Sequence, residues 1–365
     1  MTSTMRAYVN SDAAPLALTD RPIPVPGPEE VLVHTRAASL NNADLTGSGE
    51  EHVAGWEFAG DVPEVGAEAP VHLRGARVMG IAAGAFAEVV VAHHRHVVVL
   101  PETVPFDEAA TLPTALTTEH GALALGNVRP GMTVLVTAAS SGIGLIGVQV
   151  AKALGAATVV ASTRSPTKRG LLQRVGADTV VVTAVEELAA GTQDATRGQG
   201  AQLVLDHIGG DDLADAVKAA CDGEEVISVG RLGGARGSID LFALARRHVS
   251  LRSVSYGLTP PSVLGDLFDA LIPAVLPPWP TAGSGRSSTA PTRSRRPTRP
   301  SSGSPPVRPR ARSCSTWGDH RGDGDGDGEL WGGAAARQVA AHRRRTGQVS
   351  GHAESVRRAR RPGPG

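Results

Sequence analysis

The chain has 365 residues, and its 36 basic and 36 acidic side chains cancel to a formal net charge of zero. Hydrophobic residues make up 41% and charged residues 20%, which is typical of a globular protein with room for two domains. It has only two cysteines and no apolar run long enough to span a bilayer. These features exclude a disulfide framework, argue against a membrane protein and predict a cytoplasmic location.

The first part of the chain, residues 1–115, is predicted to form a β-rich domain. Apolar and polar residues alternate over 31–37, and short strand-like runs follow at 87–92 and 97–100, with Gly and Pro between them. Residues 107–125 have helical composition and bridge to a second unit.

The second part, residues 116–257, is predicted to alternate strands with helices. Gly residues end the two predicted helices at 143–154 and 166–175. Alternation of this kind indicates a parallel sheet with right-handed crossovers. The predicted strands are 133–138, 157–162, 179–183, 202–206 and 225–229, and 249–256 is a last β-like run.

The strongest chemical signal is the turn between the strand at 133–138 and the helix that follows. Its residues are Ala138-Ala-Ser-Ser-Gly-Ile-Gly144. Small residues let the backbone approach a pyrophosphate, and the amide groups at the start of the helix bind the anion. Because the motif lies between a strand and a helix, we favour a dinucleotide site over an ordinary tight turn.

The end of the next strand indicates which dinucleotide binds. NAD-specific sites place a carboxylate about 20 residues after the motif. Here the segment is Ser162-Thr-Arg-Ser165, followed by Lys168 and Arg169, with no carboxylate. Cations suit a 2′-phosphate and therefore favour NADPH over NADH; the alternative is a helix start that is basic by chance and faces solvent.

The order of motifs between Arg6 and about Leu276 resembles the quinone oxidoreductase branch of the medium-chain dehydrogenase/reductase superfamily. The matching segments are 26–33, 37–44, 55–60, 75–80, 84–88, 109–118, 138–144 and 205–210. The resemblance implies a GroES-like catalytic domain, a doubly wound Rossmann domain and substrate reduction between them. It implies that 258–277 returns to the catalytic domain.

The cofactor-binding set combines the turn, the basic segment and positions that the resemblance implies. Thr183 stands where this branch often has a Tyr near the adenine. The predicted cofactor-binding residues are Asn41, Thr117, Ala139, Ser140, Ser141, Gly142, Ile143, Gly144, Thr163, Arg164, Ser165, Lys168 and Gly230.

No metal site is predicted. Zinc-dependent relatives carry a Cys near position 41 and a His after the equivalent of Gly55, whereas this chain has Asn41 and Trp56. The cluster His93-His-Arg-His96 is interpreted as a strand end or loop, because no acidic or Cys partner is near it in the sequence.

Without a Lewis acid, a quinone or an α,β-unsaturated carbonyl is the expected hydride acceptor, because the charge delocalises onto oxygen. Asn41 and Asn42 are candidates for positioning the reactants, although Asn after a strand is equally typical of a turn. Neither Tyr8 nor Tyr256 is in a segment predicted to line the cleft, so the sequence indicates no proton donor other than water. The loop between Leu45 and Gly55 is short, which predicts an open substrate mouth.

The tail beyond about Pro277 differs from the rest. Residues 281–365 contain 17 Arg, no Lys and 6 acidic residues, a net charge of +11 against −11 for residues 1–280. Its Pro, Ser, Arg and Gly content predicts disorder over 278–365. Read from the third base of the Arg310 codon, residues 310–318 can encode Gly-Gly-Lys-Val-Val-Leu-Asp-Val-Gly, a strand that the family has. We therefore interpret the tail as a frameshift product rather than a nucleic-acid-binding extension.

Two rival functions remain open from the sequence. One is a non-catalytic NADPH-binding structural or RNA-binding protein, and the other is a zinc alcohol dehydrogenase, which the missing ligands disfavour. For the favoured enzyme, the β-like run 249–256 is predicted to be a sheet edge through which two copies form a homodimer. No membrane or nucleic-acid partner is expected.

Overall fold

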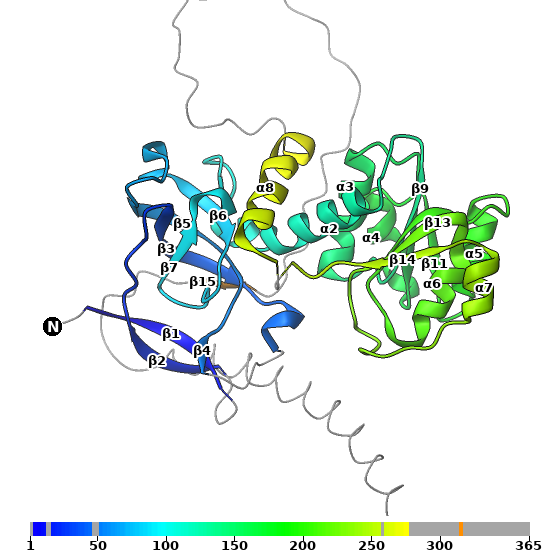
Figure 1. The fold of residues 1–365 in the computed structure, drawn as a ribbon, viewed down its shortest axis with the longest axis horizontal. Helices are drawn as coiled ribbons and strands as arrows, with labels where there is room; N and C mark the ends of the chain where they lie inside the picture. Colours follow the sequence, from blue (N-terminus) through cyan, green and yellow to red (C-terminus); the bar gives the residue numbers. More distant parts are fainter. Residues whose placement is uncertain (1–2, 12–15, 46–50, 257–258, 277–313, 317–365) are drawn as a thin grey trace, which may run out of the picture.

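The computed structural model describes residues 3–11, 16–45, 51–256, 259–276 and 314–316. Two lobes are visible, a β-rich one built mainly from the first hundred residues and an α/β one built from the middle of the chain (Figure 1). The helices α2 (Pro113–Leu125) and α8 (Pro261–Val275) lie between the lobes and pack on each other.

The β-rich lobe contains two antiparallel sheets. The three-stranded sheet has the order β2-β1-β4, and the larger one has the order β15-β3-β5-β6-β8, with β7 also paired to β3. The strands are β1 (Thr4–Asn10), β2 (Ala17–Pro22), β3 (Glu30–Ser39), β4 (His52–Val53), β5 (Glu57–Val65), β6 (Arg77–Ile81), β7 (Val89–His93), β8 (Val97–Val99) and β15 (Cys314–Thr316). Short 3-10 helices connect them at η1 (Asn42–Leu45), η2 (Val71–Leu73) and η3 (His94–His96).

The α/β lobe is built on a parallel six-stranded sheet with the order β11-β10-β9-β12-β13-β14. The order runs outward in both directions from β9 and β12, so the switch point of the doubly wound sheet lies between these two strands. The strands are β9 (Thr133–Val136), β10 (Thr158–Thr163), β11 (Thr179–Val182), β12 (Ala201–Asp206), β13 (Ala220–Ser228) and β14 (Ser250–Ser253). The helices and 3-10 turns are α3 (Gly142–Ala153), η4 (Pro166–Lys168), α4 (Arg169–Arg174), α5 (Leu188–Ala195), η5 (Gly210–Asp212), α6 (Leu213–Ala219) and α7 (Leu241–Arg246).

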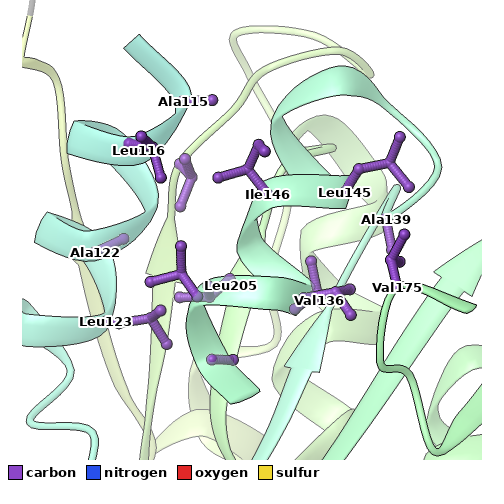
Figure 2. Packing of buried hydrophobic residues seen from close by; sticks show 14 of the residues in the cluster. Ala115, Leu116, Ala122, Leu123, Val136, Ala139, Leu145, Ile146, Val175 and Leu205 are labelled. Atoms are coloured by element: carbon purple, nitrogen blue, oxygen red, sulfur yellow. The ribbon is translucent and has the colours of Figure 1, made fainter. Parts of the chain in front are cut away.

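One apolar core joins α2 to the α/β lobe. Leu116 and Leu123 on α2 face Ile146 on α3, above Val136 of β9 and Leu205 of β12 (Figure 2). All five side chains are less than a tenth exposed. Burial of this much apolar surface fixes the position of α2 over the switch point.

Three sequence expectations need correction. The helical stretch 107–125 is two helices, α1 (Phe106–Ala109) and α2, because Pro113 lacks an amide hydrogen and starts a new helix. The last β-like run pairs only over Ser250–Ser253, and Val254 begins the crossing toward α8. A strand does follow residue 277, because β15 pairs with Ala37–Ser39 of β3. The strand lies within residues 310–318, the stretch that can encode a family-like strand when it is read in the shifted frame.

The return of the chain to the first lobe takes the form of α8. His96 Nε2 lies 2.8 Å from the carbonyl oxygen of Pro261, and the Arg95 guanidinium forms ion pairs with Asp266 and Asp269. These contacts attach α8 to η3 of the β-rich lobe.

Candidate functional site

The turn between β9 and α3 has the geometry that anion binding requires. Ser141 caps the helix, because its hydroxyl accepts a hydrogen bond of 3.1 Å from the Gly144 amide. A Cβ atom at Gly144 would lie 2.7 Å from the Cα atom of Ala139, so only glycine lets the helix approach the turn this closely. The amide of Gly144 is used by this cap, whereas those of Gly142 and Ile143 precede the hydrogen-bond ladder of α3 and are available to a phosphate.

The second part of the predicted cofactor site lies beside this turn. The hydroxyls of Ser140 and Thr163 are 2.9 Å apart, and the Thr163 hydroxyl also accepts from the Ser165 amide. Arg164 is exposed and Lys168 half-buried, and among the described residues neither forms an ion pair. Two cations without carboxylate partners next to a phosphate-binding turn are a donor set that fits a further phosphate.

On the opposite side of the site, a buried carboxylate joins the two lobes. Glu57 on β5 is 0% exposed; its Oε1 accepts a 2.7 Å hydrogen bond from the Asn41 side-chain amide, and its Oε2 accepts one of 2.9 Å from the Thr114 backbone amide. Because Asn41 donates through Nδ2, its Oδ1 faces the other way. The structure thus anchors both Asn41 and the start of α2, whereas Asn42 begins η1 and is exposed.

A second buried carboxylate, Glu119, lies on α2 itself, five residues after Thr114. Glu119 Oε1 is 2.7 Å from Nε2 of His207, and Nδ1 of His207 is 2.9 Å from the carbonyl oxygen of Thr137. Both side chains are at most 1% exposed. His207 directly follows β12 and Thr137 directly follows β9, so the pair fastens α2 to the carboxyl ends of the two strands at the switch point.

The hydrogen bonds define the protons that this pair holds. A carbonyl oxygen only accepts, so Nδ1 of His207 carries a proton, and one further proton lies between Nε2 and the Glu119 carboxyl group. Burial by itself would lower the pKa of His207, but the charges of Glu119 and Asp206 and the hydrogen bond to the Glu119 carboxylate outweigh it and raise that pKa. The other oxygen of Glu119, Oε2, is buried without a hydrogen-bond partner among the described residues.

Tyr256 lies against α2. A Cβ atom at Gly121 would lie only 2.1 Å from the Tyr256 hydroxyl oxygen, so the phenol occupies the space that this glycine leaves free. Gly121 is four residues after Thr117 and therefore lies on the same face of the helix. Burial, and then the charge of Glu119, raise the pKa of Tyr256.

The histidine cluster at the end of β7 also differs from expectation, because an acidic side chain does lie near it. Ligand atoms of Glu29, His93 and His94 are within 4.8 Å of one another, and this is the one group of potential metal ligands among the described residues. However, Nδ1 of His93 accepts a hydrogen bond of 3.1 Å from the Arg95 amide, so in the neutral ring Nε2 carries the proton. If Nε2 bound a metal, its proton would have to move to Nδ1. Nδ1 could then no longer accept the hydrogen bond from the Arg95 amide that caps η3.

Among the predicted residues, hydrogen bonds join Ser140 to Thr163 and Thr163 to Ser165, whereas Asn41, Thr117 and Gly230 have partners outside the predicted set. Gly230 follows β13, its amide donates to the Asp206 carbonyl, and a Cβ atom there would lie 2.4 Å from the His207 carbonyl oxygen. Thr117 is buried, with its hydroxyl donating to the Pro113 carbonyl.

Sequence reasoning missed Glu57, Glu119, His207 and Tyr256. Glu57 and His207 fall inside the segments 55–60 and 205–210 that carry the family resemblance, so a search for buried polar residues within these segments could have found them. Glu119 and Tyr256 have no comparable signal.

Comparison with known proteins agrees with this geometry. Residues 142–271 match the family model of zinc-binding dehydrogenases, and residues 27–102 match that of the alcohol dehydrogenase GroES-like domain. The chain is 30% identical over 254 residues to quinone oxidoreductase-like protein 2 of Bos taurus, covering 66% of this chain and 71% of the relative. It resembles the structure of the Thermus thermophilus quinone oxidoreductase, solved also as a complex with NADPH, with a TM-score of 0.64, 28% identity and coverage of 75% and 87% of the two chains.

A third likeness is to part of a much larger protein. Over 171 residues, 46% of this chain, the sequence is 39% identical to the spectinabilin polyketide synthase system protein NorB of Streptomyces orinoci, of which the match spans only 7%.

The fold and these matches define a class of oxidoreductases that have a dinucleotide-binding domain. Within that class, the chain belongs to the medium-chain dehydrogenase/reductase superfamily, in its quinone oxidoreductase-like branch.

Within the described residues, no helix is both long and apolar enough to cross a membrane.

Proposed function

We propose that the protein is an NADPH-dependent reductase that transfers a hydride to a quinone or an α,β-unsaturated carbonyl compound without using zinc. The observation that carries this proposal is the pairing of a capped βα turn with two cations, Arg164 and Lys168, that have no carboxylate partner among the described residues. The Thermus thermophilus relative, whose structure was solved with NADPH, supports the same cofactor.

The residues at the switch point fit such a cofactor. The turn 139–144 would hold the pyrophosphate, and Arg164 and Lys168 would hold the 2′-phosphate of the adenosine ribose. Asn41 and Thr117 come from opposite lobes and would orient the nicotinamide ring between them. When bound, NADPH supplies the hydride, and the protein supplies position and hydrogen-bond donors.

The donor set near Asn41 favours a reaction without zinc. Asn41 and Trp56 stand where zinc-dependent relatives have ligands, and the Glu57 carboxylate is already hydrogen-bonded to Asn41 and Thr114. Without a metal to polarise a simple ketone, a conjugated acceptor is the better substrate, because its negative charge spreads onto the oxygen as the hydride arrives.

The test is a screen of NADPH oxidation by the full chain, with naphthoquinone and benzylideneacetone as acceptors and cyclohexanone as the unconjugated control. We expect turnover with a conjugated acceptor, unchanged by a chelator, and much slower turnover with NADH. Turnover of cyclohexanone that a chelator abolishes would instead indicate a zinc enzyme. NADPH binding without turnover of any acceptor would indicate a binding protein and contradict the proposal.

A further inference from the structure

The start of β3 and the end of β7 bring a carboxylate and two histidine rings together. Glu30 pairs with His93 in the antiparallel ladder, and the His94 amide donates a 2.9 Å hydrogen bond to the Glu29 carbonyl oxygen. The rings of His93 and His94 are stacked, with their centroids 4.8 Å apart. Backbone pairing therefore keeps Glu29, His93 and His94 next to one another without the help of a ligand.

These three side chains offer the nitrogen and oxygen ligands that a zinc-type ion binds. Their ligand atoms lie within 4.8 Å of one another, and Nε2 of His93 is 3.9 Å from Oε1 of Glu29. Around a tetrahedral ion with bonds of about 2.1 Å, ligand atoms are about 3.4 Å apart. The Glu29 side chain is 60% exposed, so rotation of this side chain can close the difference. A water molecule would take the fourth position.

The charges around the cluster favour a cation. The ring of His94 is half-buried, and its nitrogens form no hydrogen bond with the described residues. The neighbouring Arg95 guanidinium is positive, but its ion pairs with Asp266 and Asp269 offset that charge. With the Glu29 carboxylate included, the local formal charge is negative when the histidines are neutral, and a negative site attracts a metal ion.

The cluster is separate from the proposed cofactor site. It lies at the Glu30 end of β3, whereas Asn41 follows the Ser39 end. A strand of ten residues spans about 30 Å. A metal ion held by the cluster is therefore too far from Asn41 to act on a substrate there, and its role must be sought in the contacts of η3.

We propose that Glu29, His93 and His94 form a binding site for a divalent transition-metal ion of the zinc class, and that binding there removes the cap of η3. If Nε2 of His93 binds the ion, Nδ1 takes the proton; if Nδ1 binds the ion, its lone pair is used. In both cases the Arg95 amide loses its acceptor. Metal binding thus acts on the segment that attaches α8 through Arg95 and His96. This inference does not depend on the proposed function.

The first test is calorimetric titration of the metal-free full chain with Zn²⁺ alone. Other histidines and the cysteines can also bind Zn²⁺, so variants identify the site. We expect His94→Ala and Glu29→Gln to weaken one Zn²⁺ binding event at least about tenfold, since loss of an outer partner of a metal ligand already costs that much. The matched control is His72→Ala, which removes an exposed histidine from η2 of the same lobe and should change nothing.

The choice of metal is tested in the same titration. Ca²⁺ prefers oxygen ligands and a high coordination number, so an excess of it should not displace Zn²⁺ from the site.

The second test uses the wild-type chain and reports the state of the rings. In NMR spectra of protein with ¹⁵N-labelled histidine, Zn²⁺ should shift the ring signals that His93→Ala and His94→Ala remove. Hydrogen exchange of the Arg95 amide should become faster, because this amide has lost its acceptor.

Four outcomes would contradict the inference. Wild-type Zn²⁺ affinity in both His94→Ala and Glu29→Gln would overturn the site, as would ring signals of His93 and His94 that stay unchanged at saturating Zn²⁺. Displacement of Zn²⁺ by Ca²⁺ would overturn the class of metal. Unchanged exchange of the Arg95 amide would overturn the link to η3. None of these measurements involves NADPH or turnover, so failure of the proposed reductase activity is a separate result.

Discussion

Arg164 is the side chain on which the choice between NADPH and NADH depends most directly. It is exposed at the end of β10, beside the Ser140–Thr163 hydroxyl pair, and has no ion-pair partner among the described residues. A charge-assisted hydrogen bond to a phosphate contributes about 1–3 kcal/mol. Arg164→Ala should therefore raise the NADPH Kd at least several-fold, as measured by fluorescence titration, and leave the NADH Kd nearly unchanged.

The matched control is Arg174→Ala, at the end of α4, the helix that follows the Arg164 segment. It removes one positive charge from the same region but lies ten residues further along the chain than Arg164. Equal weakening of NADPH and NADH binding by Arg164→Ala, or an equal effect of Arg174→Ala, would contradict the assignment.

At the scale of elements, the buried pair Glu119–His207 determines how α2 sits on the sheet. Since folding raises the pKa of His207, the native state binds its proton more tightly than the unfolded chain does. The resulting stability is fully present below the unfolded pKa of about 6.5 and is lost as the pH rises through the folded pKa. Urea unfolding midpoints should therefore fall as the pH rises through that range.

Glu119→Gln is the variant that isolates this effect. It keeps the shape of the side chain but removes the charge that raises the pKa of His207, so the pH dependence should flatten. Glu119→Leu removes the partner of His207 Nε2 and should cost about 3–5 kcal/mol at pH values where the histidine is charged. Midpoints with the same pH dependence in wild type and Glu119→Gln would show that the pair does not hold this proton.

At the scale of the whole molecule, β14 offers a surface for a second copy. Its four residues are all exposed, and among the described strands it pairs only with β13, so one edge of the six-stranded sheet is open. Open edges favour pairing with a symmetry mate. We expect a homodimer through 249–256, sedimenting as such at micromolar concentration.

Leu251→Lys tests this interface. Leu251 is 38% exposed on β14, and a two-fold axis along this edge would bring two added lysines close together. The variant should sediment as a monomer while keeping its NADPH affinity. A wild-type chain that is already monomeric at these concentrations would contradict the proposed dimer.

The reading frame after Leu276 also concerns the whole molecule. In the structure, β15 covers the β3 edge with only three residues. We propose that restoring the shifted frame over 278–365 gives a longer apolar strand at this place. The restored chain should be more stable to urea by several kcal/mol, since a longer strand would extend the pairing that β15 forms with Ala37–Ser39 of β3, next to the part of β3 that β7 covers. Resequencing that confirms the present frame, together with equal stability of both chains, would contradict this interpretation.

The sequence by itself determined the alternation of strands and helices in the α/β lobe and the capped turn before α3. Alternation over 31–37 became β3, and the small residues at 138–144 became the capped start of α3, because both signals depend on residues close together in the chain. The parallel sheet also follows from alternating strands and helices with right-handed crossovers, whereas its doubly wound order was implied by the family resemblance.

Only the tertiary structure decided which polar residues meet inside. Glu57, Glu119, His207 and Tyr256 come from four separate segments and have no periodic signal in common. Apolar packing places α2 across the switch point. The polar groups that this packing buries then form hydrogen bonds with one another. Such pairings depend on distances between segments far apart in the chain, and local composition does not encode them.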